Sequence, residues 1–144
     1  MNNMRRTFLK ASMAGGTIAV AASAGLLTPG SVLAAWPKTA FETKKMNEAI
    51  MILNGSSSTS NSKDITVEAP DIAENGAVVS VTVKTKLANV EKISVFVPEN
   101  ASPLTSSYVL GTQTDGFVTG RIKMRKTSDV IAVVKAGGKL YTAK

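Results

Sequence analysis

The 144-residue sequence contains no cysteine and no histidine. Without cysteine the chain has no disulfide, no thiolate metal site and no thiol nucleophile. Without histidine it lacks the usual general base and the commonest transition-metal ligand. Its ten acidic residues are spread among predicted turns and strand faces, with no acid–base pair at a motif spacing. The sequence therefore predicts a protein that is not an enzyme and that holds neither a metal nor a cofactor.

Aromatic residues are also scarce, at 5% of the sequence, and they do not cluster. Basic residues outnumber acidic ones by 17 to 10, but they are scattered along the chain. A protein that binds single-stranded nucleic acid combines a basic groove with aromatic side chains on which bases stack. We therefore expect no nucleic-acid partner. The surplus positive charge favours anionic small molecules or acidic proteins.

The first residues have the pattern of an export signal. The twin-arginine signature, which a translocation receptor reads, consists of Arg5, Arg6, Phe8 and Leu9. An apolar run over residues 11–27 follows, and a cleavage site of small residues ends at Ala34. The alternative is an uncleaved membrane helix, but serine, glycine and threonine interrupt the apolar run. We therefore expect export to the periplasm and cleavage of the signal.

Cleavage after Ala34 divides the sequence into a signal peptide, residues 1–34, and a mature domain, residues 35–144. A domain of this size buries roughly two-thirds of the surface of its unfolded chain, so it needs no disulfide to be stable. Three of the 17 basic residues leave with the signal while all ten acidic residues stay, which lowers the net charge from +7 to +4. No stable membrane anchor is expected after cleavage.

Residues 36–53 have the pattern of one N-terminal helix. Thr39 and Glu42 have the spacing of a capping box at its start. One apolar face consists of Met46, Ala49, Ile50 and Leu53. Gly55 follows and is expected to end the helix. Met46 and Met51 could bind a soft metal, but their place in an apolar stripe indicates packing in the core.

Short strands follow a polar loop at residues 56–63, which we expect to be mobile because it has no apolar residue to bury. The clearest strand covers residues 77–84, where Val79, Val81 and Val83 share one face. The other expected strands are 65–68, 90–97, 106–111, 117–126, 130–135 and 139–143. The last two form a hairpin about Gly137-Gly138, because paired glycines accept the positive φ of a tight turn.

Seven short strands with turns at short intervals predict a mainly β fold, an immunoglobulin-like antiparallel β-sandwich with a short N-terminal helix. No helix alternates with the strands after Gly55, which argues against a parallel sheet. The final strand has no predicted neighbour on its outer side. Such an open edge would be covered by a partner or by further residues of the chain.

Besides the twin-arginine leader, four longer stretches are distinctive: AIMILNG at 49–55, EAPDIAENGAVV at 68–79, VEKISVFVPENASPL at 90–104 and KTSDVIAVVKAGGKLYTAK at 126–144. In this order they resemble the SoxY family, the sulfur-carrier subunits of the periplasmic thiosulfate-oxidising (Sox) system. The resemblance extends over residues 4–144. The resemblance implies an immunoglobulin-like β-sandwich that pairs with a SoxZ subunit as a heterodimer and meets other Sox enzymes transiently. It also implies that sulfur is carried on a cysteine in a C-terminal Gly-Gly-Cys-Gly-Gly tail.

The sequence has no sulfur-carrier cysteine, because it ends at Lys144 and no position matches the tail. We expect that the sequence stops short of one further strand and the tail. The alternative is a cysteine-free immunoglobulin-like periplasmic interaction module without carrier chemistry, since no residue present can form a persulfide. Twin-arginine export of a cofactor-free domain is explained by a folded partner, such as SoxZ, that lacks its own signal.

A stripe of basic residues is the candidate contact for anions or for an acidic partner face. It consists of Arg121, Lys123 and Arg125, which alternate with apolar residues in the strand expected at 117–126. The alternative is a solvated strand face whose charge discourages edge pairing. Tyr108 and Tyr141 are expected to be core or interface aromatics rather than catalytic phenols.

Overall fold

The computed structural model describes residues 37–144, so Trp36 and the expected export signal with Arg5, Arg6, Phe8 and Leu9 lie outside the described residues. Two helices come first, α2 (Lys38–Glu42) and α3 (Met46–Asn54). Eight strands follow: β1 (Ser60–Asn61), β2 (Ile65–Glu68), β3 (Val79–Thr85), β4 (Val90–Phe96), β5 (Leu104–Val109), β6 (Phe117–Ile122), β7 (Ile131–Ala136) and β8 (Lys139–Ala143).

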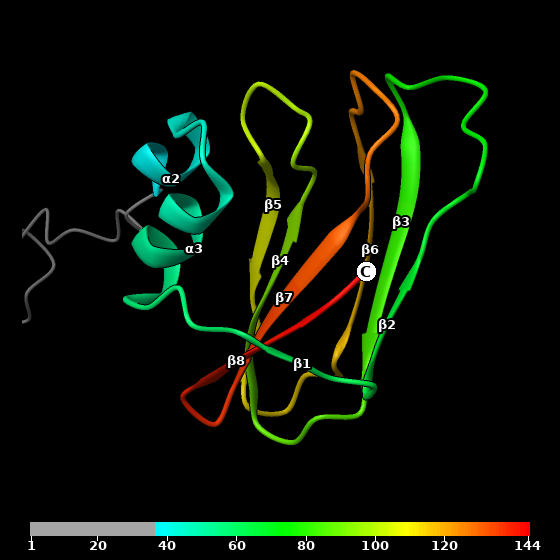
Figure 1. The fold of residues 1–144 in the computed structure, drawn as a ribbon. Coiled ribbons are helices and arrows are strands. Elements are labelled where there is room, and N and C mark those ends of the chain that lie inside the picture. Colours follow the sequence, from blue (N-terminus) through cyan, green and yellow to red (C-terminus); the bar gives the residue numbers. More distant parts are fainter. Residues whose placement is uncertain (1–36) are drawn as a thin grey trace, which may run out of the picture. The chain divides into compact units, whose positions relative to one another are not determined.

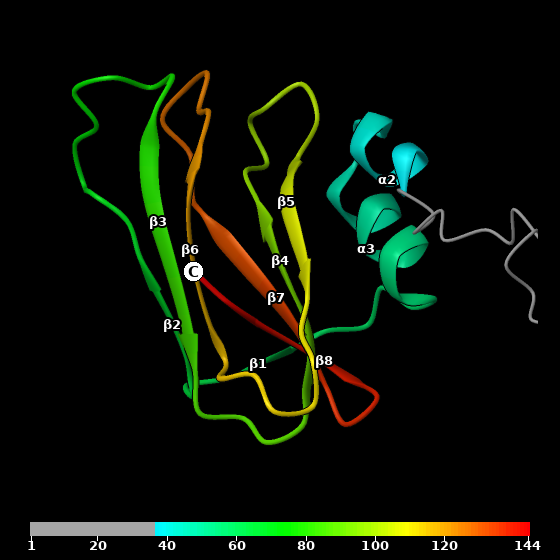
Figure 2. The same ribbon diagram turned by 180° about the vertical axis from the view of Figure 1, so that it is seen from behind.

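The strands form two sheets that pack face to face. One sheet has five strands in the order β1-β8-β7-β4-β5, and the other has three in the order β2-β3-β6. Helices α2 and α3 lie on the face of the larger sheet that points away from β3, as both ribbon views show (Figure 1, Figure 2). The described domain is thus three layers deep. The predicted immunoglobulin-like β-sandwich is confirmed.

The main core lies between the two sheets. Val79, Val81 and Val83 are at most 4% exposed, which confirms the face predicted for this strand. From the larger sheet, the buried residues that join them include Ile93, Val95, Val97, Ala132 and Val134. The period-two pattern therefore identified the inner face of each sheet, because alternate side chains of a strand point to opposite faces.

A second core lies between the larger sheet and the helices. Phe96 is fully buried there. The cluster also contains Ala40, Ala49, Ile50, Leu104, Val133 and Leu140. At the ends of this layer, the Ser102 hydroxyl donates to the Phe41 carbonyl, and the Lys92 ammonium donates to the Leu53 carbonyl at 2.7 Å. Strands β4 and β7 are consequently buried on both faces, and the buried Ser94 hydroxyl is paired with that of Ser107 at 3.0 Å.

The single helix expected over residues 36–53 is wrong, because the chain leaves helical geometry between α2 and α3. Thr43 and Lys45 are extended there, with ψ of 145° and 127°. The Thr43 hydroxyl bonds to the Glu48 carboxylate at 2.8 Å across this break. Thr39 lies inside α2 rather than at its cap, and no side chain caps that helix, so the expected capping box does not form. The break lets both helices bury residues on the sheet.

Helix α3 and its end follow the prediction with one exception. Ala49 and Ile50 are buried, and Gly55 ends the helix in the left-handed conformation with φ of 77°. Met46 packs partly buried against the second core. Met51, however, is 48% exposed, so the expectation that both methionines fill the core is wrong for Met51. It lies one position beyond the buried stripe, on the outward side of the helix.

The polar segment 56–63 is not only a loop, because Ser60 and Asn61 form β1, parallel to β8. Ser60 lies opposite Tyr141, and the Ser62 N–H donates to the Thr142 carbonyl at 3.0 Å. The final strand therefore has a neighbour on its outer side at these positions, and the expected open edge there is wrong. This short pairing is parallel, whereas all other strand pairs of the described residues are antiparallel. Backbone pairing needs no apolar side chain, so the polar composition gave no sign of it.

The hairpin about Gly137-Gly138 is confirmed. Both glycines have positive φ, 55° and 74°, and β7 pairs with β8 on either side of them. A tight two-residue turn with positive φ at both central positions matches the twist of the paired strands. These glycines are thus turn residues of the sandwich.

Candidate functional site

The basic stripe lies at the end of β6 and in the segment that follows it. Arg121 is paired with Ser80 of β3, whereas Lys123 and Arg125 come after the strand, which ends at Ile122 rather than at the expected residue 126. All three side chains are exposed, and so is that of Lys126. The structure thus brings together four basic side chains within a six-residue segment.

Beyond β6 two other loops hold the backbone of this segment. The side-chain amide of Asn100 donates to the Lys123 carbonyl at 2.7 Å and accepts from the Arg125 N–H at 3.0 Å. On the opposite side, the Met124 N–H donates to the Gly76 carbonyl at 2.7 Å. A Cβ on Gly76 would lie 2.6 Å from the Met124 carbonyl oxygen, so only glycine permits this approach.

The four basic side chains of residues 121–126 have no ion-pair partner among residues 37–144. The ion pairs of the described residues use Lys38, Lys45, Lys84, Lys135 and Lys144. The positive charge of residues 121–126 is therefore directed at solvent. We name this segment, Arg121 to Lys126, the basic ridge.

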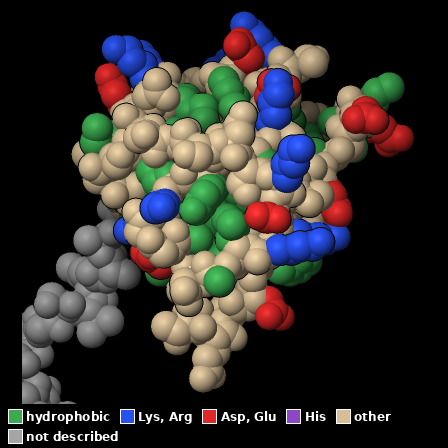
Figure 3. All heavy atoms as spheres, turned by 60° about the horizontal axis from the view of Figure 1, so that its bottom comes forward, with side chains coloured by type: hydrophobic (Ala, Val, Ile, Leu, Met, Phe, Trp, Pro, Cys, Tyr) green, Lys and Arg blue, Asp and Glu red, His purple; other side chains and the backbone are tan. Residues whose placement is uncertain are grey.

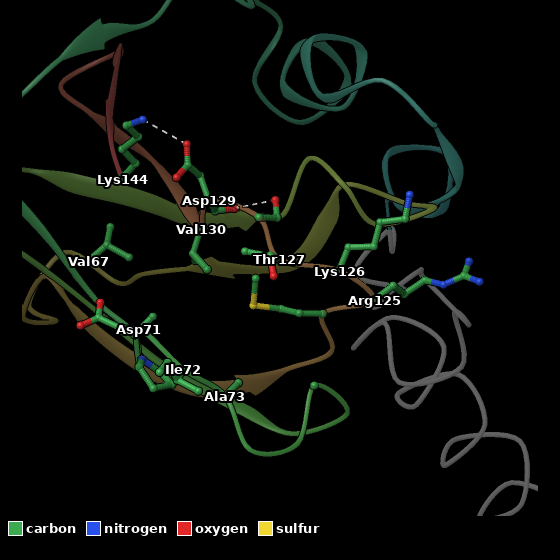
Figure 4. Close-up of a pocket in the computed structure, with 15 residues that line it drawn as sticks. Val67, Asp71, Ile72, Ala73, Arg125, Lys126, Thr127, Asp129, Val130 and Lys144 are labelled. Atoms are coloured by element: carbon green, nitrogen blue, oxygen red, sulfur yellow. Dashed lines mark hydrogen bonds and ion pairs between the residues drawn. The ribbon is translucent and has the colours of Figure 1, made fainter.

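A cleft of about 640 Å³ lies beside the basic ridge. Its two walls are the β2–β3 loop, residues 69–76, and the β6–β7 segment, residues 124–130. Figure 4 shows Asp71, Ile72 and Ala73 on one side of the hollow and Thr127 and Val130 on the other. Lys144 closes one end, where its ammonium contacts the Asp129 carboxylate at 3.1 Å. The wall at Ile72 is apolar and open to solvent, with 86% of that residue exposed.

The described residues that line the cleft form no cluster of metal ligands. Among residues 37–144 no three acidic residues lie close enough together to hold a metal ion. The carboxyl groups with shifted pKa values lie elsewhere. The Gly138 N–H, helped by Lys135, lowers the pKa of Glu91, and the Thr43 hydroxyl, helped by Lys45, lowers that of Glu48. Burial lowers the pKa of Lys92, which lies under the helices.

The end of the domain opposite the cleft loops, which are shown at the top of Figure 1, carries mixed charge. Figure 3 views the end that carries the β5–β6 loop, with acidic and basic side chains interspersed and hydrophobic side chains reaching the surface between them. The hydrophobic residues exposed to about half or more are Met51, Ile52, Ile72, Val78, Val109 and Phe117. They are spread over several elements. Within residues 37–144 no helix is long and apolar enough to cross a membrane.

The two tyrosines occupy opposite sides of the sandwich. Tyr141 packs, partly buried, against the main core. Tyr108 is half-buried on β5, and its hydroxyl lies 2.8 Å from the position that a Cβ on Gly120 of β6 would take. The expectation of a core aromatic fits Tyr141, whereas Tyr108 belongs to neither core cluster and lies where β5 and β6 approach each other. Neither the cleft nor the Asn100 contacts could be predicted from local patterns. The cleft joins residues 69–76 with residues 124–130, and the Asn100 contacts join residues 23 and 25 positions apart.

Comparisons with known proteins agree with the fold and with the sequence motifs. The family model described as sulfur oxidation protein SoxY matches residues 51–144. The chain belongs to the SoxY family. The structure of the sulfur carrier protein SoxY from Chlorobium limicola f. thiosulfatophilum is similar, with 41% sequence identity and a TM-score of 0.64 over 76% of this chain and 95% of that one. No curated protein matches the chain. The predicted membership of the SoxY family is thereby confirmed.

Proposed function

We propose that this protein is a sulfur-carrier subunit of thiosulfate oxidation. In this function it binds a SoxZ-like partner as a heterodimer and presents covalently bound sulfur intermediates to periplasmic Sox enzymes. The observation that carries the proposal is the 41% identity to a sulfur carrier protein over 95% of that protein's length, together with the SoxY family match. A carrier needs a stable domain and an accessible attachment point rather than a catalytic site.

The sulfur-bearing group in this proposal is a cysteine in a segment that follows Lys144. The 144 residues contain no cysteine and so supply no thiolate, which is the nucleophile that persulfide chemistry needs. Lys144 is exposed and lies at one end of the cleft, at the end of β8. A segment attached there would begin at the surface, and glycines in it would let it enter a partner's site.

The test is the intact mass of the protein isolated from its host after growth with and without thiosulfate. We expect a mass larger than that of residues 35–144, one cysteine that reacts with iodoacetamide, and added sulfur atoms that a reducing thiol removes. A mass equal to residues 35–144, with no alkylation, would instead support the alternative function, a cysteine-free periplasmic interaction module. That alternative is favoured by the absence of cysteine from the 144 residues.

The same mass measurement tests the proposed localisation. Export by the twin-arginine pathway with cleavage after Ala34 gives a protein that begins at Ala35. Replacing Arg5 and Arg6 by lysine should retain the uncleaved protein in the cytoplasm, because the receptor reads the arginine pair. A cleaved, periplasmic Arg5→Lys/Arg6→Lys protein would contradict this route.

The SoxZ-like partner is tested by purification from the host. We expect a second small protein without an export signal of its own to co-purify in a one-to-one ratio. Loss of that protein from the periplasm when this chain is deleted would support joint export. A monomer that carries sulfur without any partner would refute the heterodimer but leave the carrier function intact.

A further inference from the structure

Strand β6 has backbone hydrogen-bonding groups that face away from its sheet. The Thr85 N–H donates to the Gly116 carbonyl, and the Lys86 N–H donates to the Asp64 carbonyl. In an antiparallel pair the residues alternate between facing the neighbour and facing away. Even-numbered residues of β3 therefore face β2, and its odd-numbered residues face β6. With the register that pairs Val81 with Gly120, the N–H and C=O groups of Thr119 and Arg121 point outward.

This outward edge is unpaired within residues 37–144, because β6 is the last strand of its sheet. Farther along the chain the same outward positions do have a partner, since Asn100 bonds to the Lys123 carbonyl and the Arg125 N–H. Asn100 thus occupies the place that a neighbouring strand would have. The edge is occupied by this contact at residues 123 and 125 and is free along β6, residues 117–122, before it.

The side chains along the edge alternate in character. On the outer face of β6 lie exposed Phe117, Thr119 and Arg121. Like Arg121, the exposed cations of the basic ridge that follow the strand have no ion-pair partner among the described residues. On the inner face lie Val118, Gly120 and Ile122, next to Tyr108 of β5. In a sheet, directly opposite side chains of neighbouring strands lie on the same face. A strand added to the free part of β6 would therefore meet Phe117, Thr119 and Arg121 on one face, with the cations Lys123 and Arg125 just beyond its end, and an apolar surface on the other.

We propose that β6 is a docking edge for an extended segment of a protein partner in which acidic residues alternate with apolar ones. The acidic side chains pair with the basic ridge, and the apolar ones cover the gap between β6 and β5 beside Tyr108. Main-chain hydrogen bonds to Thr119 and Arg121 supply the affinity of this strand addition, and the charges select the partner. The surface does not involve the carrier cysteine, so it can exist with or without the proposed function.

The experiment selects displayed random ten-residue peptides on the immobilised protein. We expect enriched peptides with Asp or Glu at alternate positions. A synthetic copy of one such peptide should slow amide hydrogen exchange at Thr119 and Arg121, and its affinity should fall as salt rises. Enrichment without acidic residues, or protection confined to other strands, would overturn the proposal.

Charge-reversed variants test the ridge. In the triple variant R121E/K123E/R125E we expect binding at least about tenfold weaker. The matched control is K44E/K63E/K139E, which changes the net charge equally at exposed lysines on other elements and should bind nearly as the wild type does. Equal losses in both triple variants, or the same peptides selected on the ridge variant, would mean a solvated edge only.

The backbone edge is tested at Thr119. Thr119→Pro removes the outward N–H and should abolish binding, while an edge strand tolerates proline at such a position. Thr119→Val keeps the N–H and should bind normally. If Thr119→Pro does not fold, as judged by circular dichroism, the charge variants still decide. A dimer in sedimentation that Thr119→Pro dissociates would identify a second copy of this chain as the occupant and overturn the acidic partner.

Discussion

The sandwich has two margins, each formed by one edge strand of either sheet. These two sides are closed in different ways. On the covered side, β1 adds to β8, and the Ser62 N–H donates to the Thr142 carbonyl. On the open side, β5 and β6 end their sheets, and the ring of Tyr108 reaches toward Gly120. The covered side depends on backbone hydrogen bonds of a polar segment, whereas the open side depends on one side chain.

This difference has a consequence for substitutions. On the covered side, the backbone donors and acceptors matter more than the side chains that carry them. On the open side, the size of two facing residues should decide stability, and the unpaired edge remains available for binding. Side-chain truncations should therefore be costly on the open side, and proline should be costly on the covered side.

The largest effect is expected for Tyr108→Ala, with Tyr141→Ala on the covered side as its matched control. Removing the Tyr108 ring leaves a gap lined by Val81, Val83 and Val95, which no strand shields from water. We expect a loss of about 2–3 kcal/mol in the free energy of unfolding, close to a 10 °C fall in Tm. Tyr141→Ala should lose less, since β1 lies beside it. Urea denaturation measures both, and equal losses would contradict the comparison.

The next effect concerns the residue that Tyr108 approaches. A Cβ at position 120 would lie 2.8 Å from the Tyr108 hydroxyl, so Gly120→Ala forces the ring to move. We expect a loss of about 1–2 kcal/mol. The double variant Gly120→Ala/Tyr108→Phe should recover most of it, because phenylalanine lacks the hydroxyl. Additive losses in this double-mutant cycle would show that the two residues are not coupled.

A smaller effect is expected on the covered side. Ser62→Pro removes the N–H that donates to Thr142, and we expect a loss of about 1 kcal/mol with faster amide exchange in β8. Ser62→Ala is the control, since it keeps this N–H while removing the hydroxyl that accepts from the Asp64 N–H. If alanine costs as much as proline, side chains rather than backbone groups hold the covered side.

The sequence predicts those features of this arrangement that depend on residues close together in the chain, and not those that depend on distant ones. The alternation of Val79, Val81 and Val83 predicts the inner face of β3, and Gly137-Gly138 predicts the last hairpin, because each is decided by neighbouring residues. The covered side is invisible, since Ser60 and Asn61 pair through their backbone with a strand some eighty residues away. The same holds for Asn100, whose contacts at Lys123 and Arg125 depend on how the two sheets are stacked.

Family membership was predictable for a further reason. It rests on long stretches such as residues 68–79 and 126–144 rather than on any single motif. The structure places parts of both stretches in the two walls of one cleft, with Asp71 and Ile72 facing Thr127 and Val130. Their adjacency in space could not be read from the sequence, because a β-sandwich joins loops according to its strand order.

The smallest effect is the pH dependence of the stability that Glu91 contributes at the β7–β8 hairpin. The Glu91 carboxylate accepts from the Gly138 N–H at 3.0 Å and contacts the Lys135 ammonium at 3.2 Å, and these contacts lower its pKa in the folded protein. The folded state thus binds fewer protons than the unfolded state, so the stabilisation is present above the unfolded pKa of about 4.3 and is lost as pH falls through the lower folded value. Because the group is exposed, solvent screening keeps the effect small.

In urea titrations, Glu91→Gln should flatten the decline in unfolding free energy below about pH 4.3. The control is Glu99→Gln, which changes an exposed carboxyl outside the described ion pairs. An unchanged acid slope in Glu91→Gln would show that the hairpin is held by its turn and backbone pairing alone.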